Sequence, residues 1–301
     1  MKIIVTGGAG FIASHIVDGY INKGHKVVVI DNLIAGSRKN VHPKAKFYKA
    51  DVRDQAALER IFKKERPEIV SHHAALINVV ESIKNPASTI ETNVQGTMNV
   101  LATFGRNGSG KKKIIFASSS AVYGEPISLP VAETHPQSPL STYGLSKLFG
   151  EELVEFYARE LGLTYTIFRY TNVYGPRQKS GSVMPIFVRS MKHGIRPTIF
   201  GDGTKNRDYL HVSDVVPANI AALQKGNGEI INLGWGTTVS DRELFHALAA
   251  NLNFGKKPVM KPYRKGEIYS MALSARKAKK ILGWKPKILF ADGIRQTLET
   301  L

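Results

Sequence analysis

A tyrosine and a lysine four residues apart offer a phenol and an ammonium group for proton transfer. Tyr143 and Lys147 have this spacing in the segment YGLSK, which places both side chains on one face of a helix. About one such pair would arise by chance in a lysine-rich chain with eleven tyrosines, so the pair alone is weak evidence. Its meaning depends on which other groups the fold brings to the same place.

A run of three serines supplies hydroxyl groups there. Phe116–Gly124 reads FASSSAVYG and begins with a strand pattern, so the serines are predicted at the carboxyl end of a strand, where doubly wound sheets bind ligands. Ser118 and Ser120 fit a turn with hydroxyl-to-backbone bonds. Ser119 is the predicted functional hydroxyl, and the absence of a His and an Asp in hydrolase spacing argues against a nucleophilic role for it.

A glycine-rich turn near the N-terminus could bind a diphosphate. In Thr6–Ala13, TGGAGFIA, Gly7 permits a tight turn, Gly10 lets the backbone approach a diphosphate, and the following helix supplies amide donors. A flexible connection without a ligand is the alternative. Asp31 follows Gly10 by 21 residues, where an acid can bind the adenosine ribose hydroxyls and repel a 2′-phosphate, so NAD is favoured over NADP. Arg38 would favour NADP but is interpreted as a surface cation.

The elements that must position these groups alternate along the N-terminal half. Strands are predicted at Lys2–Thr6, His25–Ile30, Lys46–Lys49, Glu68–His72, Lys113–Ala117 and Thr164–Arg169, and helices at Phe11–Lys23, Gln55–Lys64, Thr89–Phe104 and Tyr143–Leu161. This order predicts an α/β fold with a doubly wound parallel sheet of the Rossmann type. A smaller α/β C-terminal substrate domain is expected, with a division at residues 1–171 and 172–301 and a return of the chain to the first domain around 206–226.

Composition narrows the class of protein. The 301 residues carry 42 basic and 24 acidic side chains, a net charge of +18 that suits an anionic partner or substrate, and the basic stretch 255–287 is interpreted mostly as solvated surface. The lack of cysteine excludes disulfides and thiolate chemistry, and the histidines lack metal-ligand spacing, so no metal is expected. No apolar run approaches the ~18 residues of a membrane span, and a cytoplasmic location is expected.

Across nearly its whole length the sequence resembles the extended short-chain dehydrogenase/reductase family, and within it the UDP-glucose 4-epimerase branch. The resemblance rests on Thr6–Gly10, Asp31–Leu33, Asp51–Asp54, His72–Ala75, Asn93–Thr97, Tyr143 with Lys147, Arg169–Pro176, Gly201–Gly203, Arg207–Val212 and Arg264–Glu267. It implies interconversion of UDP-galactose and UDP-glucose by transient oxidation at C4 of the sugar with bound NAD.

The resemblance also implies roles for the reactive groups. Tyr143 would be the base, and its pKa must fall from about 10 toward about 7, which Lys147 and the nicotinamide cation are expected to achieve by favouring the phenolate. Ser119 would hydrogen-bond the sugar O4. The remaining residues implied to bind NAD are Gly7, Gly10, Phe11, Ile12, Asp31, Asn32, Gly36, Ser37, Asp51, Val52, His73, Ala74, Ala75, Asn93, Ser118 and Tyr170.

The UDP-sugar would contact Ser119 and Tyr143 together with residues of the C-terminal part. Those implied are Asn172, Val183, Phe200, Arg207, Arg264, Glu267 and Met271, with the arginines on the diphosphate. The arginines could instead be surface ion-pair residues, and Asp51 could be a loop cap. Family members commonly form homodimers through two helices per subunit, here Thr89–Phe104 and Tyr143–Leu161.

Other functions remain open. A flexible methionine at position 271 could admit an N-acetyl group, so UDP-GlcNAc or UDP-glucuronate 4-epimerase is an alternative. A nucleotide-sugar dehydratase would carry an acid beside the central hydroxyl residue, whereas this chain has Ser120-Ala121, with Glu125 as a weaker acid. A non-catalytic NAD- or nucleic-acid-binding module has no need for Ser119, Tyr143 and Lys147 together. No nucleic-acid partner is expected, because aromatic residues are not interleaved with the basic stretch.

Overall fold

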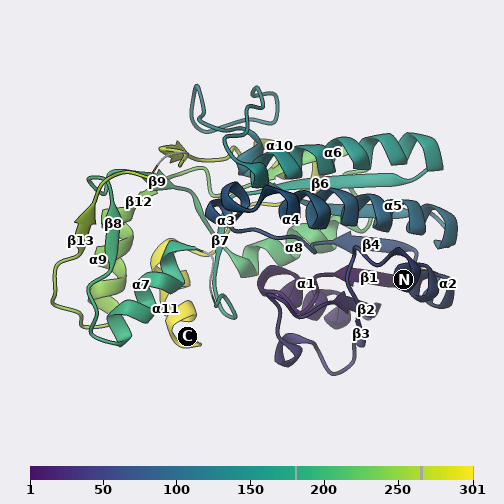
Figure 1. Ribbon diagram of the computed structural model, residues 1–301, viewed down its shortest axis with the longest axis horizontal. Coiled ribbons are helices and arrows are strands. Elements are labelled where there is room, and N and C mark those ends of the chain that lie inside the picture. Colours follow the sequence, from purple (N-terminus) through teal and green to yellow (C-terminus); the bar gives the residue numbers. More distant parts are fainter. Residues whose placement is uncertain (180–181, 265–266, 301) are drawn as a thin grey trace.

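The computed structural model describes residues 1–179, 182–264 and 267–300, and its centre is a parallel sheet of seven strands. The strand order is β11-β6-β5-β4-β1-β2-β3, and every neighbouring pair is parallel. The strands are β1 (Lys2–Thr6), β2 (Lys26–Asp31), β3 (Lys46–Lys49), β4 (Ile69–His72), β5 (Lys113–Ser119), β6 (Thr164–Tyr170) and β11 (Glu229–Leu233). The sheet with its covering helices forms the right-hand part of the view in Figure 1.

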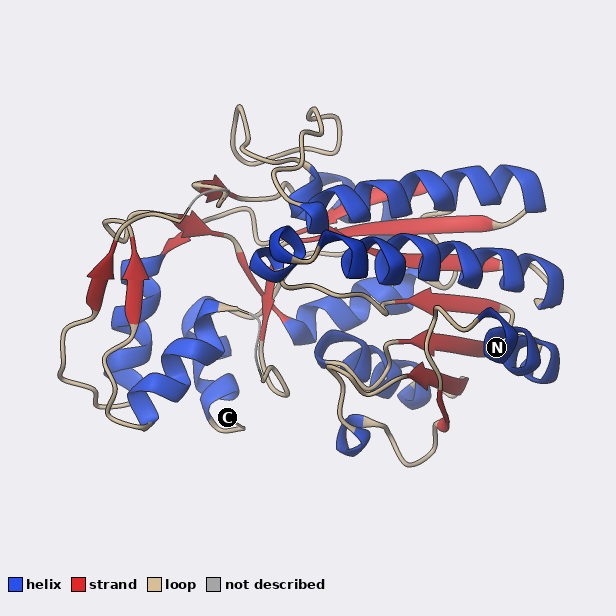
Figure 2. Ribbon diagram, viewed as in Figure 1, coloured by secondary structure: helices blue, strands red, loops and turns tan. Residues whose placement is uncertain are grey.

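Helices cover both faces of the sheet, as Figure 2 shows. They are α1 (Phe11–Asn22), α2 (Gln55–Glu65), α3 (Val79–Lys84), α4 (Pro86–Ile90), α5 (Gly96–Asn107), α6 (Thr142–Leu161), α8 (Val212–Ala222) and α10 (Arg276–Leu282), with short turns η1 (Arg38–Asn40), η2 (Glu91–Gln95) and η3 (Ser120–Val122). Because strand side chains alternate between faces, Ile3 and Val5 pack with α1 and α8, whereas Ile4 packs with α2 and α5. Burial on both faces explains the Val- and Ile-rich strands.

The predicted doubly wound Rossmann sheet is confirmed, but one predicted helix is interrupted and the sheet has one more strand than predicted. The expected helix Thr89–Phe104 is broken: α4 ends at Ile90, η2 forms a π-helical turn, and α5 begins at Gly96. The turn brings Asn93 inward, where its side chain bonds the backbone of Leu76 and the hydroxyl of Ser146. Helix α8 lies within the expected return at residues 206–226 and packs against the sheet, and it leads into the seventh strand, β11, which the sequence analysis does not predict.

A second lobe, at the left of Figure 1, is built from small sheets and three helices. Its elements are β7 (Asn172–Tyr174), α7 (Val183–Lys192), β8 (Thr198–Phe200), β9 (Asn206–Arg207), β10 (Tyr209–His211), β12 (Val239–Ser240), α9 (Asp241–Asn251), β13 (Val259–Lys261), β14 (Ser270–Met271) and α11 (Phe290–Leu298). The three helices share an apolar core around Phe187, Leu244 and Ile294. Strand β9 lies between β12 and β14. Within the described residues, no helix has the length and hydropathy that crossing a membrane requires, and a cytoplasmic location stays a prediction.

The start of α6 touches the loop after β5, and this contact yields a prediction. A Cβ at Gly144 would lie 2.6 Å from the carbonyl oxygen of Ala121, which is backbone and cannot rotate away. We expect Gly144→Ala to push α6 from β5, lowering stability by about 1–3 kcal/mol and turnover by at least about tenfold. Urea denaturation and initial rates measure both effects. Gly255→Ala is the control, because a Cβ there meets no atom within 4 Å; equal behaviour of the two variants would contradict the prediction.

Candidate active site

The carboxyl ends of the parallel strands gather the predicted catalytic residues at one edge of the sheet. Ser119 is the last residue of β5, and its hydroxyl accepts a hydrogen bond from the amide of Ala121 at 3.2 Å. Tyr143 lies in the first turn of α6, which Ser141 caps by accepting the amide of Gly144 at 3.1 Å. Burial raises the pKa of Tyr143, and a hydrogen bond with Ser119 opposes the rise. The structure therefore brings the predicted phenol and hydroxyl together.

Lys147 lies one turn further along α6 and is buried. Its ammonium donates to the carbonyl oxygen of Ala117 at 2.8 Å and lies 5.2 Å from the centre of the Phe116 ring. Burial lowers the pKa of Lys147 to about 8, and the charge of Glu151 opposes this shift. The expected lowering of the tyrosine pKa is not present in the protein alone, because removing the phenolate of Tyr143 from water costs more than its hydrogen bond returns.

The glycine-rich turn forms a cradle that side chains would fill. A Cβ at Gly7, whose φ is +69°, would lie 2.8 Å from the amide nitrogen of Ala74, and one at Gly36 would lie 3.0 Å from Ala9. Gly10 is the N-cap of α1 and supplies no side chain, so the first amides of the helix have no side-chain cap. Such a turn suits a diphosphate, which accepts hydrogen bonds from amides at a helix N-terminus.

Asp31 closes one side of this cradle. Its carboxylate, at the end of β2, accepts hydrogen bonds from the amide of Ala9 at 3.0 Å and of Leu33 at 2.7 Å. A carboxylate oxygen can accept more than one bond, so ribose hydroxyls can add to these. Arg38 stacks over the ring of Phe47 at 4.6 Å, which agrees with its interpretation as a surface cation. The residues present therefore fit a dinucleotide without a 2′-phosphate.

The other residues predicted to bind NAD follow the ends of successive strands or begin the first helix. Phe11 and Ile12 open α1, Asn32, Gly36 and Ser37 follow β2, Asp51 and Val52 follow β3, His73, Ala74 and Ala75 follow β4, Asn93 lies in η2, Ser118 lies in β5 and Tyr170 ends β6. Asp51 accepts hydrogen bonds from Arg53 at 2.9 Å and from Asn32 at 2.8 Å. The Arg53 guanidinium holds the pKa of Asp51 well below its usual range.

Two adjacent histidines at the end of β4 make hydrogen bonds and stacking contacts within the protein. His72 hydrogen-bonds the hydroxyls of Thr6 at 2.6 Å and Thr97 at 2.9 Å, and His73 stacks on Tyr170. Burial lowers the pKa of His72 to about 3 and of His73 to about 4, so both imidazoles are neutral at pH 7. Within the described part of the chain, no group of three or more His, Asp and Glu side chains is arranged to hold a metal ion.

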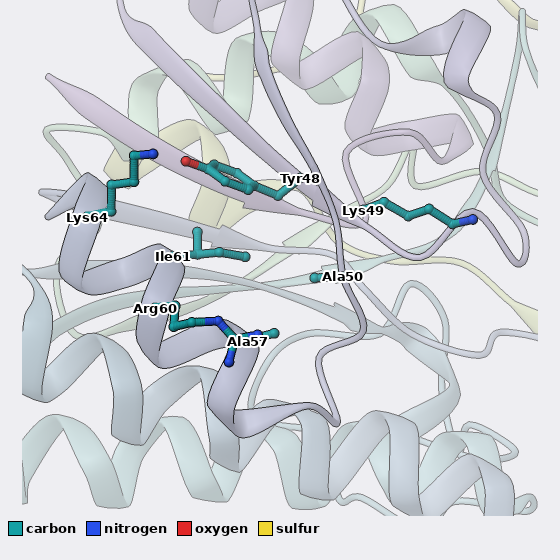
Figure 3. Close-up of a pocket in the computed structure, with 7 residues that line it drawn as sticks. All are labelled: Tyr48, Lys49, Ala50, Ala57, Arg60, Ile61 and Lys64. Carbon is teal, nitrogen blue, oxygen red and sulfur yellow. The ribbon is translucent and has the colours of Figure 1, made fainter.

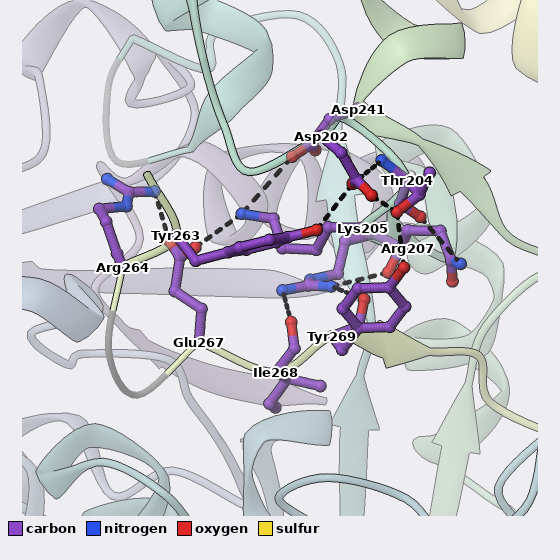
Figure 4. Close-up of polar contacts among 11 residues, drawn as sticks. Asp202, Thr204, Lys205, Arg207, Asp241, Tyr263, Arg264, Glu267, Ile268 and Tyr269 are labelled. Atoms are coloured by element: carbon purple, nitrogen blue, oxygen red, sulfur yellow. Dashed lines mark hydrogen bonds and ion pairs between the residues drawn. The ribbon is translucent and has the colours of Figure 1, made fainter. Parts of the chain in front are cut away.

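Polar side chains of the second lobe form the network drawn in Figure 4. The Arg264 guanidinium lies 4.0 Å from the centre of the Phe200 ring and pairs with Glu267, which also receives the Lys205 ammonium at 2.6 Å. The structure therefore brings three of the predicted substrate residues into contact. Lys205, which the sequence analysis missed, is nearly buried and also lies 3.5 Å from Asp241.

The remaining predicted substrate residues of the C-terminal part lie on four different elements. Asn172 begins β7, Val183 begins α7 and Arg207 ends β9. Met271, in β14, is 1% exposed and packs with Val122 and Tyr123 of the loop after β5. Its contact with a sugar stays a prediction.

Sequence analysis also missed the buried support behind the reactive groups. Glu151, one turn after Lys147, accepts a hydrogen bond from Ser118 and forms an ion pair with Arg169 at 2.6 Å. Two signals were available: Glu151 repeats the four-residue spacing of Tyr143 and Lys147, and Arg169 is a charge inside a buried strand.

A separate cavity of about 260 Å³ lies between β3 and α2 (Figure 3). Its lining consists of Tyr48, Lys49, Ala50, Ala57, Arg60, Ile61 and Lys64. Strand β3 is the edge of the sheet remote from β5, so this cavity takes no part in the arrangement around Tyr143.

Comparison with known proteins agrees with this geometry. Residues 3–234 match the model of the NAD dependent epimerase/dehydratase family. The chain is 43% identical to a UDP-glucose 4-epimerase from Thermotoga maritima, solved with UDP-glucose, with a TM-score of 0.97 over 100% of this chain and 98% of the other. It is 38% identical to a Thermus thermophilus UDP-glucose 4-epimerase in complex with NAD, with a TM-score of 0.94 over 100% and 98% of the chains.

Sequence relatives give the same result. A UDP-glucose 4-epimerase of Mycolicibacterium smegmatis is 36% identical over 99% of this chain and 98% of its own. The chain therefore belongs to the NAD-dependent epimerase/dehydratase family, as its resemblance to the extended short-chain dehydrogenases implied. It is an enzyme, and its cofactor is NAD.

The position of Asp31 predicts the choice of cofactor. We expect Asp31→Ala to raise the Kd for NAD about tenfold, because the ribose hydroxyls lose a hydrogen-bond acceptor. The ratio of the Kd for NADP to the Kd for NAD should also fall, because the 2′-phosphate of NADP no longer meets a repelling charge. Calorimetric titration with each dinucleotide measures both. Asp31→Asn, which keeps an acceptor oxygen, controls for the loss of the bonds to Ala9 and Leu33. An unchanged ratio of the two affinities would contradict the assignment.

Proposed function

We propose that this enzyme is a UDP-glucose 4-epimerase that interconverts UDP-galactose and UDP-glucose. The observation that carries the proposal is the convergence of Ser119, Tyr143 and Lys147 beside the glycine cradle at one edge of the sheet. Bound NAD supplies a hydride acceptor and donor for C4 of the sugar and is regenerated in each turnover. The name and bound UDP-glucose of the Thermotoga maritima protein support the same substrate.

The protein's own task is to move the proton of the sugar 4-hydroxyl. Tyr143 accepts it as the base, and Ser119, which hydrogen-bonds Tyr143, orients the same oxygen. In the protein without ligands burial raises the pKa of Tyr143, and the hydrogen bond with Ser119 only opposes this rise. The additional positive charge of the oxidised nicotinamide would favour the phenolate, which couples base formation to cofactor binding.

The second lobe holds the nucleotide diphosphate. Arg207 and Arg264 are assigned to the phosphate oxygens, because guanidinium groups bind them with paired hydrogen bonds. Asn172 and Phe200 are assigned to the remainder of the substrate. An anchor on the diphosphate leaves the sugar free to turn, so that either face of the 4-keto intermediate can be reduced.

The alternative chemistries have less support. The residues after Ser119 are Ser120 and Ala121, which carry no carboxyl group for proton transfer at C5. Glu125 is already bonded to two backbone amides, so it is poorly placed to act as an acid. A UDP-GlcNAc or UDP-glucuronate 4-epimerase would use the same base and differs only in the sugar.

The test is the conversion of UDP-galactose to UDP-glucose in a reaction without added reductant or NAD. Chromatography measures the product. We expect Tyr143→Phe to lower kcat at least about 100-fold, because it removes only the proton acceptor. Tyr157→Phe, on the same helix, is the control and should keep wild-type activity. Turnover of UDP-GlcNAc or UDP-glucuronate alone would keep the mechanism and change the sugar. No reaction of any UDP-sugar with NAD supplied would contradict the function.

A homodimer through α5 and α6 is part of the proposal. Leu145, Phe149 and Phe156 of α6 are 37%, 41% and 48% exposed, and their spacing places them on one face of the helix. A helix face with this much exposed apolar area suits contact with the same face of a second copy of the chain.

We expect Phe149→Glu combined with Phe156→Glu to convert a dimer into monomers at micromolar concentration, because the charges would be buried at the interface. Light scattering coupled to gel filtration measures the mass. Ile195→Glu is the control, since Ile195 is 61% exposed in the second lobe. A wild-type monomer, or a mass unchanged by both charges, would contradict the interface.

A further inference from the structure

Glu125 joins the loop that follows the active-site serines to the second lobe. Its side chain is exposed, yet both carboxylate oxygens are engaged: Oε2 accepts from the amide of Tyr269 at 2.6 Å and Oε1 from the amide of Ser270 at 3.3 Å. Glu125 directly follows Gly124, only six residues after Ser119. The carboxylate therefore links the catalytic edge of the sheet to the start of β14.

The same stretch of backbone holds Arg207 from its other side. The Arg207 guanidinium donates to the carbonyl oxygens of Ile268 and of Tyr269, the latter at 3.1 Å, and to the carbonyl oxygen of Asn206 at 2.7 Å (Figure 4). No partner for its Nε–H occurs among the described residues, so part of the guanidinium remains available to a ligand. The carbonyl contacts fix the orientation of that free part.

Two consecutive peptide groups are therefore held at both ends. The peptide between Ile268 and Tyr269 donates its N–H to Glu125 and accepts from Arg207 with its C=O, and the peptide between Tyr269 and Ser270 does the same. Because a peptide group is planar, fixing its N–H also fixes its C=O. A negative charge at the N–H ends and a positive charge at the C=O ends also polarise these groups in the same sense.

We infer that Glu125 is a positioning residue for the nucleotide diphosphate and acts on Arg207 through these two peptides. The inference rests on the proposed function, which places the diphosphate at Arg207. Glu125 touches neither the reacting sugar nor the phosphates in this role. It sets the direction in which the free N–H groups of Arg207 point.

A purely electrostatic effect of the Glu125 charge would change the affinity for the diphosphate in the opposite direction. If Glu125 acted only as a negative charge near a diphosphate, removing it would strengthen binding. If it acts through the peptides, removing it lets the Ile268 carbonyl turn and weakens binding, whereas the Tyr269 carbonyl is also held by the amide of Asn206 at 3.1 Å. The direction of the change in affinity therefore separates the two explanations.

The loop has a second attachment that keeps a Glu125 variant folded. The amide of Val131 donates to the carbonyl oxygen of Ala272 at 2.7 Å, and the amide of Ser274 donates to the carbonyl oxygen of Val131 at 2.8 Å. Val131 is also buried against Leu273. Removal of an exposed carboxylate leaves these contacts in place.

The experiment is calorimetric titration of the NAD-loaded enzyme with UDP. We expect Glu125→Ala to raise the Kd for UDP about tenfold, and Glu125→Gln, which keeps one acceptor oxygen, to have a smaller effect. The KM for the UDP-sugar should rise in parallel while kcat changes less than about twofold. Glu299→Gln removes an exposed charge from α11's end and should leave the Kd unchanged.

A double-mutant cycle tests whether Glu125 acts through Arg207. In an Arg207→Met background, Glu125→Ala should have no further effect on the Kd for UDP. Equal or tighter UDP binding by Glu125→Ala, or additive effects of the two substitutions, would overturn the inference about Glu125 but not the proposed function. A wild-type enzyme that neither binds UDP nor converts a UDP-sugar would instead contradict the proposed function and remove the role of Arg207 with it.

Discussion

The buried ion pair between Arg169 and Glu151 holds together the elements that carry the active site. Arg169 is 1% exposed on β6, and its guanidinium binds both oxygens of Glu151 on α6 and the hydroxyl of Tyr123 at 2.9 Å. Ser118 at the end of β5 donates to the same carboxylate. Loss of either partner would leave a charge buried without compensation, so β5, β6 and α6 must keep one arrangement.

This arrangement explains why neighbouring residues differ in role. Ser118 bonds Glu151 in the interior, whereas Ser119, the last residue of β5, reaches toward Tyr143 at the start of α6. On α6, Lys147 and Glu151 lie one turn apart on the same face as Tyr143. The ion pair behind β5 thus sets the distance between the strand that carries the hydroxyl and the helix that carries the base.

The sequence predicted the parts of the site that local rules determine. Gly7, Gly10 and Asp31 are tied to a strand, a turn and a helix that follow one another, and a strand pattern alone places Ser119 at a sheet edge. The sheet order around β1, β2 and β4 follows from the same alternation. The π-helical turn at Asn93 and the strand Glu229–Leu233 depend on contacts with distant segments, which periodicity in one segment does not contain.

Glu125 shows where reasoning from sequence stops. Its neighbours in the chain suggested an acid beside the catalytic hydroxyl, but its partners are amides 144 and 145 residues further along. Tyr269 precedes β14 and Ser270 begins it, and because β14 pairs with β9 on one side only, both amides can reach Glu125 on the loop after β5. A motif specifies the residue types of a site, whereas the orientation of the Arg207 guanidinium depends on two peptide groups that no motif includes.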